Sequence, residues 1–195
     1  MLSKAEGQEL IKSARSAIFF ELNSTDPYLK VYETKFEEKQ GLFVTLNKNN
    51  ELRGCIGFPQ PILPLNQAII EAATAAAFED PRFPPVTKEE LDKIQIELSV
   101  LSVPELIKVN SPEEYLDKIN IGIDGLIIHA QFTSGLLLPQ VFTEHNCSPL
   151  QALQMLCQKA GLGINSWKDQ WNKEEESIQI FKFQAQIFEE IQNES

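Results

Sequence analysis

Two segments of this chain alternate between their two faces with a period of two, and this is the strongest constraint on its fold. Residues 94–102 read IQIELSVLS, and residues 41–47 read GLFVTLN. In an extended chain such alternation places the apolar side chains on one face and the polar ones on the other. The pattern predicts half-buried β-strands, so an all-helical fold is excluded.

The segments around these strands favour helices and hairpins. A capping box at Ser3 and Glu6 opens an amphipathic stretch over about 4–22. The Ala-rich residues 65–78 are typical of a helix that packs closely on a sheet. Asparagines and a lysine at 48–50 predict the turn of a β-hairpin.

The second half shows the same mixture. Asp124-Gly125 predicts a hairpin turn within 121–130, Ser148 begins a capped helix, and residues 181–187 alternate as a late strand. Helices and hairpins follow one another without regular βαβ units, which predicts an α+β fold with antiparallel sheets. Strand clusters at 42–102 and 119–188 suggest two lobes, each a sheet packed with helices.

Composition and charge exclude several classes of protein. The 195 residues carry 17 Lys and Arg against 28 Asp and Glu, a net charge of −11, which argues against nucleic-acid binding. No apolar stretch approaches the roughly 20 residues that span a membrane, and MLSKAEGQEL has no signal-peptide pattern. Three cysteines without CxxC spacing predict free thiols in the cytoplasm, and two histidines without ligand spacing argue against a metal site.

The most unusual segment is LRGCIG at 52–57. In a strand, Arg53 and Cys55 share one face, and Gly54 and Gly57 allow close approach by a ligand or another backbone. An arginine beside a thiol favours the reactive thiolate. Cys55 is then a nucleophile or a ligand-binding residue. The alternative is a small residue buried beneath the 65–78 helix.

The segment DPRFPP at 80–85 holds two further candidates. Its prolines could fix Asp80 and Arg82 rigidly at the rim of a cleft. Alternatively, Asp80 caps a turn and Arg82 pairs with a carboxylate. The sequence leaves both interpretations open.

Candidate acid–base groups lie elsewhere. Glu97 faces away from the apolar side of its strand. It could be a proton-transfer group, a partner of Arg53 or a solvated side chain. His129 or His145 could complete a Cys–His pair with Cys55, or be an ordinary hydrogen-bonded histidine. No phosphate-binding, dinucleotide-binding, zinc-protease or nucleophile-elbow motif is present, so the sequence names no cofactor.

An ordered set of motifs resembles the AMMECR family from about residue 10 to 185. The set comprises GLFVTL (41–46), LRGCIG (52–57), DPRFPPV (80–86), ELSVLS (97–102), GIDGLII (122–128), LLLPQV (136–141) and CQKAGL (157–162) with Trp167. The resemblance implies two lobes, the larger holding both termini and the smaller coming from mid-chain, with the hexapeptide toward the inter-lobe cleft. The family has no established activity. Microbial members resemble partners of Memo-like and radical-SAM proteins.

The resemblance has two local departures. Many relatives carry His where Asp124 stands, and His145-Asn146-Cys147 replaces a segment that typically contains Trp. Within a single AMMECR domain over 1–195, we expect the smaller lobe at about 40–110 and the larger at 1–39 plus 111–195.

Two functions follow as hypotheses. The first is a cleft-based enzyme or enzyme subunit that uses Cys55 beside Arg53 on an anionic small molecule or protein substrate. The second is a non-catalytic adaptor or binding module for a Memo-like or radical-SAM partner.

Overall fold

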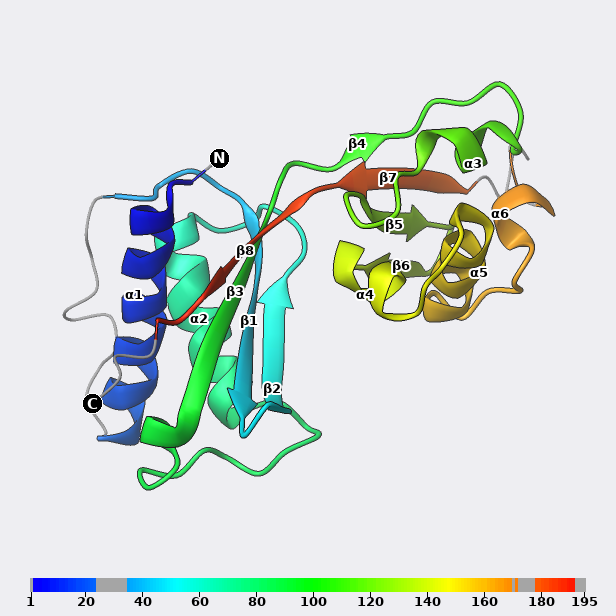
Figure 1. Cartoon of the computed structure of the whole chain (residues 1–195). Coiled ribbons are helices and arrows are strands. Elements are labelled where there is room, and N and C mark those ends of the chain that lie inside the picture. Colours follow the sequence, from blue (N-terminus) through cyan, green and yellow to red (C-terminus); the bar gives the residue numbers. More distant parts are fainter. Residues whose placement is uncertain (1, 24–34, 170, 172–177, 192–195) are drawn as a thin grey trace. The chain divides into compact units, whose positions relative to one another are not determined.

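The computed structural model describes residues 2–23, 35–169, 171 and 178–191 (Figure 1). It confirms the α+β class, because the described residues form two four-stranded antiparallel sheets packed with helices. The chain divides into two compact units. Unit 1 holds the residues up to Leu101 together with those from Gln186, and unit 2 is Ser102–Ala185.

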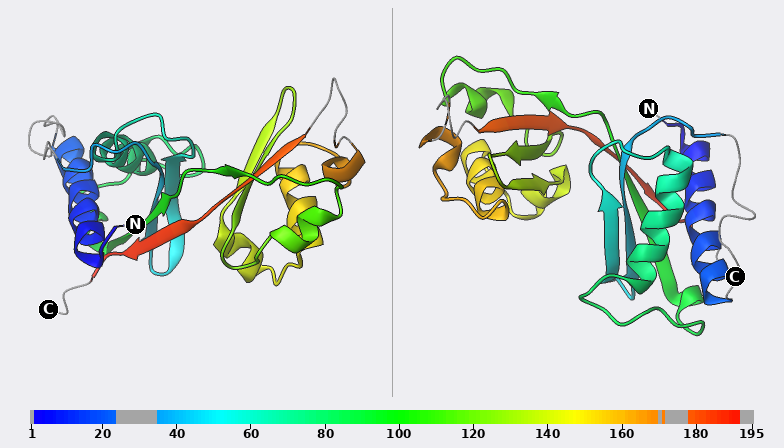
Figure 2. Two further views of the ribbon diagram at one scale, coloured as in Figure 1. Left: turned by 90° about the horizontal axis from the view of Figure 1, so that it is seen from above. Right: turned by 180° about the vertical axis from the view of Figure 1, so that it is seen from behind.

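Unit 1 is one sheet with two helices on the same face. Its strands β1 (Gly41–Lys48), β2 (Glu51–Phe58), β3 (Ile94–Leu101) and β8 (Ala185–Glu189) lie in the order β2-β1-β3-β8. Figure 2 shows the helices α1 (Lys4–Leu22) and α2 (Leu65–Phe78) on one side of this sheet. The alternation explains the arrangement, since the apolar set of each strand packs with both helices in one core, which includes Leu42, Val44, Leu46, Ile96, Leu98 and Val100. We call the opposite side the helix-free face, because in the described part of unit 1 no helix covers it.

The hairpin between β1 and β2 contains a shift of register. Asn49 and Asn50 both have positive φ angles, 54° and 63°, as a two-residue hairpin turn requires. Lys48 pairs with Glu51 and Asn47 with Leu52, but Leu46 pairs with Gly54. Arg53 is therefore the extra residue of a β-bulge, and from Gly54 onward the side chains of β2 change face.

Unit 2 is a second sheet with its own core. The strands β4 (Glu105–Leu106), β5 (Gly125–His129), β6 (Ser134–Leu137) and β7 (Gln179–Phe183) lie in the order β4-β7-β5-β6. The helices are α3 (Glu114–Lys118), α4 (Pro139–Glu144), α5 (Pro149–Lys159) and α6 (Ser166–Asp169). Leu153 and Leu156 of α5 join Leu126 and Ile128 of β5 in this core. The capping box at Ser148 and Gln151 starts α5, as expected.

Two expected elements differ in the structure. Asp124-Gly125 is not a hairpin turn, because the Asp124 carboxylate accepts hydrogen bonds from Asn120, and the left-handed residue is Gly122 with φ 84°. Strand β5 pairs with β6 and β7 instead of residues 121–123. The expected late strand over 181–187 is two strands, β7 and β8, which belong to different sheets.

The limits of the units also differ from the expected lobes. Residues 40–101 do not form a lobe of their own, because α1 shares a single core with β1, α2 and β3. The smaller unit begins only at Ser102. The chain returns to unit 1 at Gln186, where the segment 179–189 changes sheet. Alternation marks a strand but carries no information about which sheet it joins.

Candidate functional site

Cys55 lies on the helix-free face of unit 1, at the edge strand β2. Its neighbour Gly54 faces α2 so closely that an added Cβ atom would lie 2.1 Å from the carbonyl oxygen of Ala76. The residue beneath the Ala-rich helix is therefore Gly54, and Cys55 is half-buried on the other side. At Gly57 an added Cβ would lie 2.2 Å from the carbonyl oxygen of Leu42. Both glycines thus serve close packing within unit 1.

An ion pair from the DPRFPP segment holds the backbone of Cys55. The N–H of Cys55 donates to Oδ2 of Asp80 at 2.9 Å, and Nη2 of Arg82 donates to the carbonyl oxygen of Cys55 at 3.2 Å. Arg82 also donates from Nε and Nη2 to the two Asp80 carboxylate oxygens, at 2.9 and 2.7 Å. We call this arrangement the Asp80–Arg82 clamp. It satisfies the outward-pointing backbone groups that an edge strand otherwise leaves open.

The clamp also fixes its own charges. Hydrogen bonds from the Arg82 side chain hold the pKa of Asp80 well below its usual range; burial opposes this effect, and the N–H groups of Cys55 and Arg82 add to it. Asp80 in turn raises the pKa of Arg82, with a smaller contribution from the Cys55 side chain in the same direction. The cation beside the Cys55 thiol is therefore Arg82. Its side chain is 53% exposed, whereas that of Asp80 is 2% exposed.

Arg53 has a different environment from the one expected. Its Nε and Nη2 donate to Glu90 at 3.3 and 3.1 Å, and the guanidinium lies 5.9 Å from the ring centroid of Phe83. Lys48 binds the same carboxylate at 2.6 Å. Arg53, then Lys48, lower the pKa of Glu90 to about 2. Arg53 is 9% exposed, so it ties the 80–90 loop to the hairpin instead of facing solvent.

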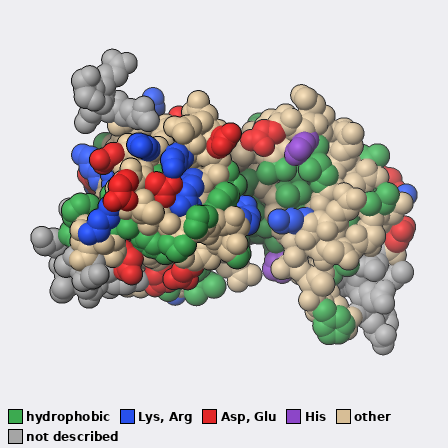
Figure 3. Space-filling model, turned by 90° about the horizontal axis from the view of Figure 1, so that it is seen from below, with side chains coloured by type: hydrophobic (Ala, Val, Ile, Leu, Met, Phe, Trp, Pro, Cys, Tyr) green, Lys and Arg blue, Asp and Glu red, His purple; other side chains and the backbone are tan. Residues whose placement is uncertain are grey.

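Basic side chains near this loop are matched by acidic ones. On the face of the molecule in Figure 3, Lys and Arg side chains lie among Asp and Glu. Lys48 and Arg53 share Glu90, and Arg82 pairs with Asp80. Arg82 still has two unused donors on Nη1, which makes no hydrogen bond within the described residues.

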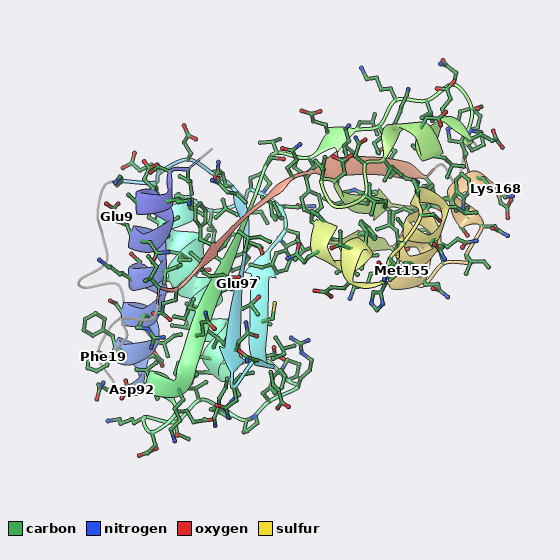
Figure 4. All side chains as sticks on the ribbon, in the orientation of Figure 1. Glu9, Phe19, Asp92, Glu97, Met155 and Lys168 are labelled. Carbon is green, nitrogen blue, oxygen red and sulfur yellow. The ribbon has the colours of Figure 1, made fainter. Side chains whose placement is uncertain are left out.

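Three side chains of the helix-free face lie in one row across the sheet. Thr45 of β1 pairs with Cys55 of β2 on one side and with Glu97 of β3 on the other. The Thr45 hydroxyl donates to Cys55 Sγ at 3.4 Å. Figure 4 shows Glu97 projecting from β3 on the side away from α2. We call Cys55, Thr45 and Glu97 the Cys55 row.

The remaining candidates belong to unit 2 or stand alone. His129 ends β5, and its ring lies 5.1 Å from that of Phe181. Both histidines belong to unit 2, so a Cys–His pair with Cys55 stays a prediction. Cys157 is fully buried in the core of unit 2, and burial raises the pKa of its thiol. Among the described residues no group of three His, Cys, Asp or Glu could hold a metal ion.

Sequence reasoning missed Thr45 and Glu90. Alternation places Thr45 on the polar side of β1, but its position opposite Cys55 depends on the bulge at Arg53, which has no sequence signal that we could identify. Glu90 follows Thr87 at capping-box spacing, and its carboxylate does accept from the Thr87 N–H at 3.2 Å. That local role hid the ion pairs with Lys48 and Arg53.

Comparisons with known proteins confirm the resemblance to the AMMECR family. The family model described as AMMECR1 matches residues 11–188. Protein MJ0810 of Methanocaldococcus jannaschii is 48% identical over 194 residues, which cover 98% of this chain and 94% of that protein. A relative from Thermococcus onnurineus is 52% identical over 158 residues, covering 78% of this chain and 74% of that protein. The crystal structure of the uncharacterized protein PH0010 from Pyrococcus horikoshii has a TM-score of 0.81 and 45% identity, covering 94% of this chain and 90% of that chain.

None of the helices in the described residues is long and apolar enough to cross a membrane.

Proposed function

This chain belongs to the AMMECR1 family, and we propose that it acts through the Cys55 thiolate, as a nucleophile toward an anionic ligand anchored by Arg82. The observation that carries the proposal is the setting of the sulfur. Cys55 is half-exposed on the helix-free face, Thr45 donates to Sγ, and the clamp fixes the backbone of the same residue. The sulfur thus has one hydroxyl donor and one cation, Arg82, as polar neighbours.

Arg82 is the natural anchor for the ligand. Its Nε and Nη2 are engaged by Asp80 and Cys55, while Nη1 keeps both of its donors and the side chain is half-exposed. A guanidinium edge of this kind suits a carboxylate or another oxoanion. Because the chain has a net charge of −11, an anion is attracted to a local positive charge such as that of Arg82. Arg53 is buried against Glu90 and supports the loop that carries Arg82.

The test is the rate of alkylation of Cys55, followed by peptide mass spectrometry. Neutral iodoacetamide and anionic iodoacetate are each compared with their rates on N-acetylcysteine at pH 7. We expect Cys55 to react faster than the small thiol and to favour iodoacetate. Arg82→Gln should lose the preference for the anion, and Arg82→Lys, which keeps the charge, should retain part of it. A Cys55 rate no higher than that of N-acetylcysteine with both reagents would contradict the proposal.

One observation favours a second candidate, a non-catalytic binding module. Both histidines of the chain lie in unit 2, so unit 1 offers Cys55 no histidine base of its own. The partner would be a Memo-like or radical-SAM protein bound through the helix-free face. A stoichiometric complex that survives Cys55→Ser, together with an ordinary alkylation rate, would support this candidate over the first.

A further inference from the structure

The Cys55 row contains a carboxylate that the proposed nucleophile does not contact directly. Thr45 stands between Cys55 and Glu97, directly opposite each of them in the register of the three strands. Side chains of directly opposed residues on one face have Cβ atoms about 4.5–5.5 Å apart. The carboxylate of a glutamate lies two carbon atoms beyond its Cβ. The Glu97 carboxylate can therefore span this gap and reach the Thr45 hydroxyl.

The clamp brings the sulfur close to Thr45. Because the N–H and C=O of Cys55 point outward to Asp80 and Arg82, they do not bond to β1. Cys55 and Thr45 therefore form a non-hydrogen-bonded pair, the kind in which opposed side chains lie closer together. The result is the distance of 3.4 Å between Thr45 Oγ1 and Cys55 Sγ.

A hydroxyl in this position can pass a proton along the row. A threonine hydroxyl has one hydrogen to donate and lone pairs to accept, while an ionised carboxylate only accepts. The separation of oxygen and sulfur fits an S–H that donates to Thr45 as well as an O–H that donates to a thiolate. The two directions correspond to the states before and after proton transfer.

We infer that Glu97 is the proton acceptor for Cys55 and acts through Thr45. The inference deepens the proposed function and depends on it. The Cys55 proton passes to Thr45 Oγ1 while the Thr45 proton passes to the Glu97 carboxylate. A thiolate and a carboxylic acid result, Thr45 is unchanged, and nothing is oxidised or reduced. Thr45 and Glu97 are positioning and proton-transfer residues, and Cys55 is the group that meets the ligand.

Several charged side chains lie near the row within the described residues. The 80–90 loop contributes Arg82 and Asp80 beside Cys55. On β1 the polar-side neighbours of Thr45 are Phe43 and Asn47, which are uncharged. Strand β8 lies beside β3, and the hydrogen bond from the Glu190 N–H to the Ile96 carbonyl places Glu189 next to Glu97. Two neighbouring carboxylates disfavour a second negative charge, which helps one of them to take up a proton.

The experiment is the pH profile of Cys55 alkylation by iodoacetamide between pH 5 and 9. An ordinary cysteine reacts appreciably only as the pH approaches about 8.5. With an internal acceptor the thiolate forms without losing a proton to solvent, so the wild type should show a shoulder of reactivity at low pH. We expect Glu97→Gln and Thr45→Val to lower the rate at pH 6 by about ten- to a hundredfold. Thr45→Ser, which keeps the hydroxyl, should keep the shoulder.

Two further variants separate a proton path from a simple charge effect. The double variant Thr45→Val with Glu97→Gln should be no slower than either single variant, because both interrupt the same path. Glu189→Gln removes a neighbouring charge and should leave the shoulder in place. Far-UV circular dichroism confirms that each variant is folded.

The outcomes for the two proposals are distinguishable. If Cys55 is fast but the shoulder persists in Glu97→Gln, or if Glu189→Gln has the same effect as Glu97→Gln, the inference is overturned and the reactive thiol stands. If wild-type Cys55 is no faster than N-acetylcysteine at any pH, the proposed function fails, and the inference fails with it.

Discussion

At Cys55, side chains take the place of a neighbouring strand. The Asp80 carboxylate accepts from the backbone N–H and Arg82 donates to the backbone carbonyl, as a paired strand would. A half-exposed ion pair contributes little stability by itself. Its value is geometric, because it closes the edge of the sheet and holds the sulfur and the Arg82 guanidinium at a fixed separation. Arg53, the more conspicuous arginine of the motif, supports this arrangement from behind through Glu90.

The Glu90 ion pairs predict a specific response to acid. The pKa of Glu90 lies near 2 in the folded chain against an ordinary value of 4.5. A carboxyl group with a lowered folded pKa stabilises the fold above its unfolded pKa, and this stabilisation is lost as the pH falls toward the folded value. We expect Glu90 to contribute about 2–3 kcal/mol at pH 7, lost progressively between about pH 4.5 and 2.

Urea unfolding of Glu90→Gln checks this expectation. The variant should be less stable than the wild type at pH 7 and should lose less stability between pH 5 and 2.5. The exposed Glu51, at the start of β2, provides the matched control Glu51→Gln, which should follow the wild-type pH dependence. If the stability of Glu90→Gln falls with pH as steeply as that of the wild type, the ion pairs do not set the acid stability.

At the scale of elements, regular patterns were predictable and their connections were not. The strands at 41–48 and 94–101 follow from alternation, and α1 and α2 begin and end close to the expected residues because caps and an Ala-rich run mark them. The Asp124-Gly125 hairpin failed because the Asp124 carboxylate satisfies backbone and side-chain donors of Asn120 instead of completing a turn. Cys55, Asp80 and Arg82 were identified as candidates from the sequence. Their mutual contacts depend on a bulge and a loop geometry that have no periodic signal.

The packing of β2 on α2 gives a second stability prediction. A Cβ at position 54 would overlap the Ala76 carbonyl oxygen of the helix backbone, which cannot rotate away. We expect Gly54→Ala to destabilise the chain by about 1–3 kcal/mol in thermal unfolding. Gly163→Ala is the control, because its Cβ would meet only Ser166 Oγ at an ordinary 3.4 Å. Equal effects of the two substitutions would argue against a close strand–helix contact.

At the scale of the whole molecule, the chain has two cores that share no residues. Unit 1 is built from both ends of the chain, so it is completed only when β8 joins β3. Unit 2 is a single continuous segment whose described residues close around α5. Both tryptophans, Trp167 and Trp171, belong to unit 2, so tryptophan fluorescence reports on that unit alone.

This distribution of tryptophans allows each core to be followed separately. Leu98→Ala in unit 1 and Leu153→Ala in unit 2 each remove a fully buried side chain, at an expected cost of about 2–5 kcal/mol. We expect Leu153→Ala to lower the urea midpoint of tryptophan fluorescence. Leu98→Ala should lower the midpoint of far-UV circular dichroism and leave the fluorescence midpoint in place. A lowered fluorescence midpoint in Leu98→Ala would show that the chain unfolds as one cooperative body.

The extra residue in β2 decides which chemistry Cys55 can have. Without the bulge, the turn at Asn49 and Asn50 would pair Cys55 with Val44, whose side chain lies in the core. The sulfur would then be sealed beneath α2, and Gly54 would face solvent with nothing to offer a ligand. Straight pairing of the same residues would thus exchange a thiol open to reagents for an inert one, whereas deletion of the extra residue, Arg53, would keep the cysteine opposite Thr45. For chains with this hairpin, the bulge and the number of residues from turn to cysteine together decide which face the sulfur takes.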